Sequence, residues 1–202
     1  MSISSYLKST EPAVQQMFLA LDLYSRMTLR LSLEKYRDER GVIILDRDQA
    51  LDYLIDLGDS QSLDFAKSTL CGAIIQVAYS GIVQFSKNLV IPESCKEMGV
   101  KNESKSLKFC TGRIVHDLPI GLYIYAARIQ YNHWEEGFPT NLVAKNVFIH
   151  LIRIHYEDPV FDLAYEMDWP IPRPITHHVL LLELKWREYD NYLEDMNEMI
   201  GE

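Results

Sequence analysis

The segment from Arg128 to His133, with the sequence RIQYNH, carries residue types that suit acid–base chemistry on a phosphate. An arginine offers a forked and permanently charged donor that matches phosphate oxygens. A histidine exchanges a proton near neutral pH, so it can take the proton of a ribose 2′-hydroxyl or protonate the leaving oxygen. Arg128 and His133 together therefore suit RNA transesterification without a metal, with the arginine stabilising charge on the phosphoryl group.

Helical geometry limits how these side chains meet. A separation of five residues places Arg128 and His133 about 140° apart around a helix axis. The two groups must therefore converge through side-chain length, an unwound helix end or a second subunit. Tyr125, Arg128 and Asn132 share one face of the helix, and we expect Asn132 or Tyr131 to help orient the phosphate.

A structural role explains the same segment equally well. Arg128 would then act as a cap or form an ion pair with Glu135 or Glu136, and His133 would lie half-buried beside Trp134. The residues alone leave both interpretations open.

Other polar residues point less directly to chemistry. Arg113 and His116 lie just before the helix that carries Arg128, so we expect them either to add positive charge near that arginine or only to settle a turn. The histidines at 150 and 155 lack the i, i+3 or i+4 pairing with a carboxylate that metal sites in helical bundles use. His177 and His178 are adjacent and should point to different helix faces. We therefore expect neither a metal site nor a cofactor.

Charge and cysteine content narrow the functional classes. The 202 residues include 20 Lys and Arg against 29 Asp and Glu, a formal charge of −9. This balance disfavours a protein that coats nucleic acid through many phosphate contacts, although a local arginine cluster stays compatible with it. Three cysteines without a CxxC spacing argue against a disulfide framework and suit a reducing cytoplasm, with Cys71 as a small buried residue. The N-terminal sequence has no signal-peptide pattern.

Apolar residues recur at helical spacing along most of the chain, which predicts an all-α fold. We expect residues 1–202 to form a single domain, one bundle of about six to seven helices. Residues 88–106 predict a polar loop or insertion, and residues 168–176 a proline-rich linker to the C-terminal helix. The expected helices are Glu11–Arg40, a helix from Asp46 to Gly58, Ser62–Ser86, a helix capped by Asp117 and ended by Gly137, a helix capped by Thr140 and reaching Tyr156, Pro159–Met167, and a last helix capped by Thr176.

The uncharged stretch Ser68–Ser86 admits three interpretations. Its density of Ile, Val and Tyr between Gly72 and Val83 suits a strand, and its length suits a membrane span. Polar residues and glycines make it weakly apolar for contact with lipid, so we favour a helix buried centrally in the bundle and expect no membrane association.

The Arg-x4-His signature of Arg128 and His133, on a helix in a small all-α bundle, resembles the HEPN superfamily. The resemblance covers the motif and, more loosely, the helix order from Ser62 to Tyr156. It implies an RNase that works without a metal as a homodimer, with two motifs meeting in one cleft, in toxin–antitoxin or defence systems. By position, it implies that Arg128 binds the scissile phosphate and that His133 is the catalytic acid or base. The family usually has a polar residue after the arginine, where this chain has Ile129.

Three hypotheses follow. The first is a metal-independent endoribonuclease that cleaves single-stranded RNA, acts as a homodimer and is controlled by an antitoxin or another protein partner. The second is a non-catalytic HEPN-like module for dimerisation or protein binding, which Ile129 and the negative charge favour. The third is a sensor of an anionic nucleotide that uses Arg113, His116 and Arg128.

Overall fold

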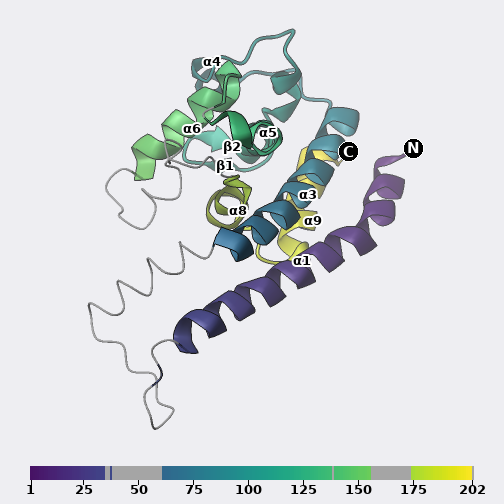
Figure 1. Ribbon diagram of the computed structural model, residues 1–202. Helices are drawn as coiled ribbons and strands as arrows, with labels where there is room; N and C mark the ends of the chain where they lie inside the picture. Colours follow the sequence, from purple (N-terminus) through teal and green to yellow (C-terminus); the bar gives the residue numbers. More distant parts are fainter. Residues whose placement is uncertain (35–36, 38–60, 138, 156–173, 202) are drawn as a thin grey trace.

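A computed structural model describes residues 1–34, 37, 61–137, 139–155 and 174–201. The expected all-α bundle is confirmed in this part of the chain, which holds seven α-helices and a single two-stranded sheet (Figure 1). The helices expected between residues 46 and 58 and between 159 and 167, and residues 168–173 of the expected linker, lie outside the described residues. The α-helices are α1 (Ile3–Glu34), α3 (Gln61–Phe85), α4 (Glu93–Glu97), α5 (Ile120–Asn132), α6 (Leu142–His155), α8 (Thr176–His178) and α9 (Tyr189–Ile200).

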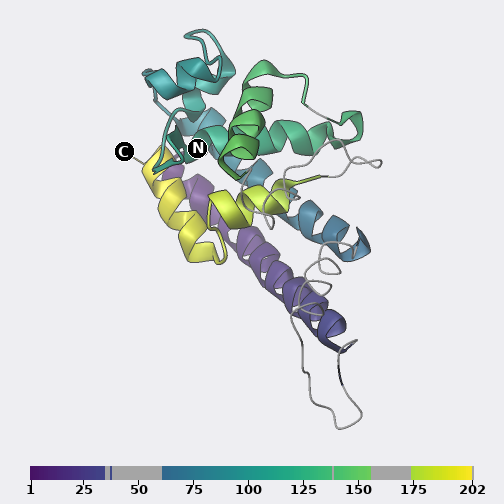
Figure 2. The ribbon, with the colours of Figure 1, turned by 90° about the vertical axis from the view of Figure 1, so that its left-hand side faces the viewer.

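Helix α1 begins earlier than the sequence suggested. The Ser2 hydroxyl accepts a hydrogen bond from the Ser5 amide at 3.2 Å and so caps the first turn. Pro12, which we expected near the start of this helix, lies inside it. Figure 2 shows α9 beside the N-terminal half of α1, whose C-terminal half runs on beyond α9. The expected end at Arg40 lies past the described part of α1, which closes at Glu34.

Helix α3 forms the centre of the bundle and confirms the helical interpretation of this stretch over the strand. It packs against α1, α5, α8 and α9, and Cys71 is fully buried as expected. Residues 65–85 of α3 are long and apolar enough to cross a membrane by length and composition, but half of the most apolar window is buried in the bundle. A central core helix satisfies the same criteria, so α3 alone is weak evidence for a membrane span.

The segment between α3 and α5 is more ordered than a polar loop. It contains α4, a 3₁₀ turn at Lys105–Phe109 (η1), and a hairpin of β1 (Ile114–Val115) with β2 (Leu118–Pro119). The two residues of the hairpin turn, His116 and Asp117, both have positive φ, which matches the tight turns that join antiparallel strands. The prediction that Asp117 caps the next helix is therefore wrong, because α5 begins at Ile120 after Pro119.

Helix α5 carries Arg128 and ends just before His133, and α6 packs against α5. Helix α5 ends at Asn132, earlier than expected, because the His133 amide donates to the Gln130 carbonyl and starts a 3₁₀ turn at Trp134–Glu136 (η2). The expected stop at Gly137 ends this turn instead. The cap of α6 is Asn141 rather than the expected Thr140, because the Asn141 side chain accepts the Ala144 amide hydrogen bond at 3.0 Å.

The expected single C-terminal helix is divided into three pieces. Helix α8 passes into a π-helical turn at Val179–Glu183 (η3), and α9 starts only at Tyr189. Thr176 does not cap α8, because its hydroxyl donates to the Ser68 carbonyl of α3 at 3.1 Å. Trp186 lies in the break and is fully buried. Its indole N–H donates to Asp195 at 2.6 Å, which fixes this connection against α9.

Candidate active site

Arg128 is held in place on the last full turn of α5 by residues of two helices. Its Nε donates to Oε1 of Gln76 on α3 at 3.1 Å, and its guanidinium carbon lies 4.9 Å from the ring centroid of Tyr79. This second contact has the geometry of a cation–π interaction. With its amide oxygen turned toward the guanidinium, Asn132 accepts from Nη1 at 2.7 Å and Nη2 at 2.8 Å. The half-buried charge therefore has a fixed position between α3 and α5.

His133 lies at the end of α5, with about half of its side chain exposed. Its Nδ1 is 2.9 Å from Oε1 of Glu136, which η2 brings back toward it. A carboxylate at Nδ1 favours the tautomer with the proton on that nitrogen and leaves Nε2 as the basic atom. Such a pair orients the imidazole for proton transfer, as in the His–carboxylate pairs of hydrolases.

The structural alternative expected an ion pair between Arg128 and Glu135 or Glu136, and the structure shows other partners for Arg128 and Glu136. Glu136 binds His133, while Arg128 takes Gln76 and Asn132 as partners. Trp134 packs against Phe65 of α3, with ring centroids 5.8 Å apart. Arg128 and Asn132 are thus in direct contact, and His133 follows them where the helix unwinds.

The two tyrosines expected near the phosphate pack into the bundle. The ring of Tyr131 lies over Gly72 of α3, where an added Cβ would come within 2.3 Å of it. Tyr125 is buried and stacks on Tyr79, with ring centroids 6.3 Å apart. Its hydroxyl accepts from the Asn141 amide at 3.3 Å, and burial raises its pKa. Tyr125 thus supports the ring against which Arg128 lies.

Arg113 and His116 have partners from a different part of the fold. Arg113 donates from Nε and Nη2 to Asp195 of α9 at 2.9 and 3.1 Å, and from Nη2 to the Leu184 carbonyl. His116 Nε2 lies 3.4 Å from Glu183 at the end of η3. The partners of Arg128 come instead from α3 and α5, so the contacts within the described residues do not join these two groups to Arg128.

Sequence reasoning missed two supporting residues of this site, Gln76 and Tyr79 of α3. It named Glu136 as a partner of Arg128, whereas the structure pairs Glu136 of η2 with His133. Gln76 and Tyr79 are three residues apart and share one helix face within an otherwise apolar stretch, and this was the available signal. Pairing that face with α5 required the packing of the two helices.

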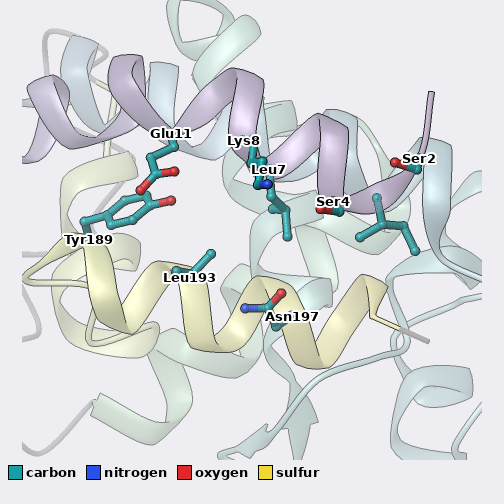
Figure 3. A pocket seen from close by; sticks show the side chains of 9 residues that line it. Ser2, Ser4, Leu7, Lys8, Glu11, Tyr189, Leu193 and Asn197 are labelled. Atoms are coloured by element: carbon teal, nitrogen blue, oxygen red, sulfur yellow. The ribbon is translucent and has the colours of Figure 1, made fainter.

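A separate groove of about 500 Å³ lies between α1 and α9 (Figure 3). In Figure 3, Glu11 of α1 lies beside Tyr189 of α9, and burial together with Glu11 raises the pKa of that tyrosine. Neither Arg128 nor His133 lines this groove. The lining residues are Ser2, Ile3, Ser4, Leu7, Lys8 and Glu11 from the N-terminal segment and α1, and Tyr189, Leu193 and Asn197 from α9.

No protein-family model matches the chain, and no curated protein or solved structure matches it either.

Proposed function

We propose that this protein is an HEPN-like, metal-independent endoribonuclease in which Arg128 binds the scissile phosphate and His133 transfers the proton. The observation that carries the proposal is the pairing of an exposed imidazole with a carboxylate, one residue beyond the helix that holds a fixed guanidinium. A general base needs a defined tautomer and access to substrate, and a phosphate site needs a charge that does not reorganise.

The proposed reaction breaks the bond between phosphorus and the 5′ oxygen. His133 Nε2 takes the proton of the 2′-hydroxyl, and the 2′ oxygen attacks phosphorus. The imidazolium, or the His133 of a second subunit, then protonates the departing 5′ oxygen. The products are a 2′,3′-cyclic phosphate and a 5′-hydroxyl.

Arg128 compensates the charge on the phosphoryl oxygens during this reaction. Its Nη atoms bind the exposed side chain of Asn132, so a phosphate reaches them by displacing or joining that amide. Among the described residues, Arg128 binds Gln76 while His133, just past the end of α5, binds Glu136. A homodimer with two motifs facing one cleft would supply both groups to one phosphate. We further propose a cytoplasmic location and control by a protein partner such as an antitoxin.

The test is cleavage of single-stranded RNA by purified protein in the presence of EDTA, followed by analysis of the product ends. Arg128→Ala and His133→Ala should each lower the rate by at least about 100-fold, the lower end of what a general base or a charge-stabilising donor contributes. Arg26→Ala is the matched control, because this exposed arginine of α1 forms a surface pair with Asp22 and is not part of the proposed site. Equal cleavage by all variants, or none by the wild type, would contradict the proposal.

A second candidate function is a non-catalytic interaction module. One observation that favours it is that Nε, Nη1 and Nη2 of Arg128 all have protein partners. Another is a stripe on α1, where Leu19, Leu23 and Met27 recur every four residues and expose 62%, 57% and 44% of their surfaces. If wild-type protein is inactive on RNA and Leu23→Lys converts a dimer to a monomer in sedimentation, this function is the better assignment.

A further inference from the structure

Glu183 is a fully buried carboxylate with two imidazoles directed at it. His155 Nε2 lies 3.1 Å from its Oε1, and His116 Nε2 lies 3.4 Å from its Oε2. One ligand atom from each of the three side chains lies within 4.8 Å of the other two. A buried carboxylate is costly unless cationic or hydrogen-bonding groups compensate it, and the two imidazoles are groups of this kind.

We propose that His116, His155 and Glu183 form a binding site for a divalent transition-metal ion, with Zn²⁺ as the species to test. Bond lengths of about 2.0–2.1 Å at tetrahedral angles put neighbouring zinc ligands about 3.3–3.4 Å apart. The distances from His155 Nε2 and His116 Nε2 to Glu183 are 3.1 and 3.4 Å, but they run to different carboxylate oxygens. The three ligand atoms lie within 4.8 Å of one another, so small side-chain rotations bring them to this separation around one ion. Two imidazoles and a carboxylate are also a donor set that zinc and other first-row divalent ions accept.

The backbone around His116 presents this ligand from a fixed turn. His116 has φ of 46°, a left-handed conformation that costs free energy for a residue other than glycine. Two side chains secure the turn: His150 Nε2 lies 2.7 Å from the His116 carbonyl, and the Tyr123 hydroxyl donates to the Val115 carbonyl at 3.0 Å. These two contacts hold the backbone from which the His116 imidazole projects.

The other two ligands come from two further helical elements. His155 is the last described residue of α6, and Glu183 is the last residue of the π-helical turn η3. π-Helical turns occur often at functional sites, because the extra residue changes the direction of a side chain. Arg113 secures the exit of η3 by donating to the Leu184 carbonyl while it is bound to Asp195.

A metal ion bound by these three side chains should be reachable from solvent through the exposed side of His116. Glu183 is fully buried and His155 is 13% exposed, whereas His116 is 37% exposed. Three protein ligands leave a fourth position for water or a substrate atom, as in zinc sites made of two histidines and a glutamate. The opening lies on the His116 side. This site is independent of the Arg128 and His133 assignment and takes none of its residues.

The experiment is calorimetric titration of tag-free full-length protein with Zn²⁺, with Co²⁺ absorption spectra as a second readout of coordination. The wild type should bind one ion per chain at this site, and Co²⁺ should give the intense visible bands of a four-coordinate complex. His116→Ala alters a partly exposed side chain and should weaken binding by more than about 100-fold, beyond the 10–100-fold cost of losing an outer-shell contact. Glu183→Gln should do the same, whereas Glu198→Gln, at an exposed position of α9, should keep wild-type affinity.

Circular dichroism checks that each variant is folded, and His116→Ala keeps the test decisive if Glu183→Gln fails to fold. Three results would overturn the proposal. The first is no binding by the wild type, and the second is His116→Ala binding as tightly as Glu198→Gln. The third is loss of binding only in His177→Ala, which would assign the ion to His177 and His178, whose ring centroids are 3.7 Å apart.

Discussion

Replacing Asp195 with alanine should destabilise the fold through one buried network. The Asp195 carboxylate accepts from Arg113 Nε and Nη2 at 2.9 and 3.1 Å and from Trp186 Nε1 at 2.6 Å. Trp186 is fully buried, so its indole N–H would lose its charged acceptor, at a cost of about 1.5–3 kcal/mol. Arg113 is 36% exposed and can turn to water, which limits its contribution to about 0–1 kcal/mol. The expected loss in free energy of unfolding is therefore about 1.5–4 kcal/mol.

Urea unfolding followed by circular dichroism measures this loss. With a slope of about 2 kcal/mol per molar urea, the midpoint should fall by about 0.8–2 M. Asp195→Asn keeps an acceptor for Trp186 and should lose less. Glu194→Ala, which removes an exposed carboxylate from the same helix, should stay within about 0.5 kcal/mol of the wild type.

A double-mutant cycle with Trp186→Phe isolates the indole hydrogen bond. Removal of both groups should show a coupling of at least about 0.5 kcal/mol, because the second change no longer leaves a buried donor unpaired. An Asp195→Ala protein as stable as Glu194→Ala, or additive effects in the cycle, would refute the reasoning.

Two further predictions test the elements that carry Arg128. Gly121→Ala should cost at least about 2 kcal/mol in the same unfolding assay, because its Cβ would lie 2.4 Å from the Phe109 carbonyl oxygen, a backbone atom with little freedom to move. Asn141→Ala should cost about 1 kcal/mol through loss of the α6 cap, while Thr140→Ala should have little effect; the reverse order would restore the cap expected from sequence.

The sequence predicted elements best where local pattern and packing agree. The end of α3 at Phe85 was predicted to within a residue, and the buried helix was predicted because a long uncharged stretch can bury itself only in the centre of a bundle. The C-terminal stripe was misleading, because apolar residues at helical spacing fit one helix as well as two. The break between η3 and α9 contains Trp186, whose indole donates to Asp195 of α9. This is a tertiary contact, which a local pattern does not contain.

The predictions of helix caps at Asp117 and Thr176 were wrong for a related reason. Asp117 has the residue type of a helix cap, but the hairpin takes it into a left-handed conformation, and Thr176 uses its hydroxyl on Ser68 of α3. These competing uses arise from segments distant in sequence, which a local pattern does not contain.

In the candidate sites too, local motifs could be read from the sequence, whereas contacts between distant segments could not. Arg128 and His133 could be proposed from the sequence because their motif is local, whereas Gln76 joins Arg128 from another helix. His116, His155 and Glu183 were missed as a group because each comes from a different element and their spacing follows no helical period.

The most direct test of the nuclease assignment is subunit mixing in the EDTA cleavage assay. Arg128→Ala and His133→Ala proteins, each inactive alone, are mixed under conditions that exchange subunits, and RNA cleavage is followed with time. If two motifs build one cleft, the mixed dimer contains an intact arginine and an intact histidine, so activity should return to a measurable fraction of the wild-type rate. Persistent inactivity after proven exchange, or wild-type activity in either variant alone, would contradict the account.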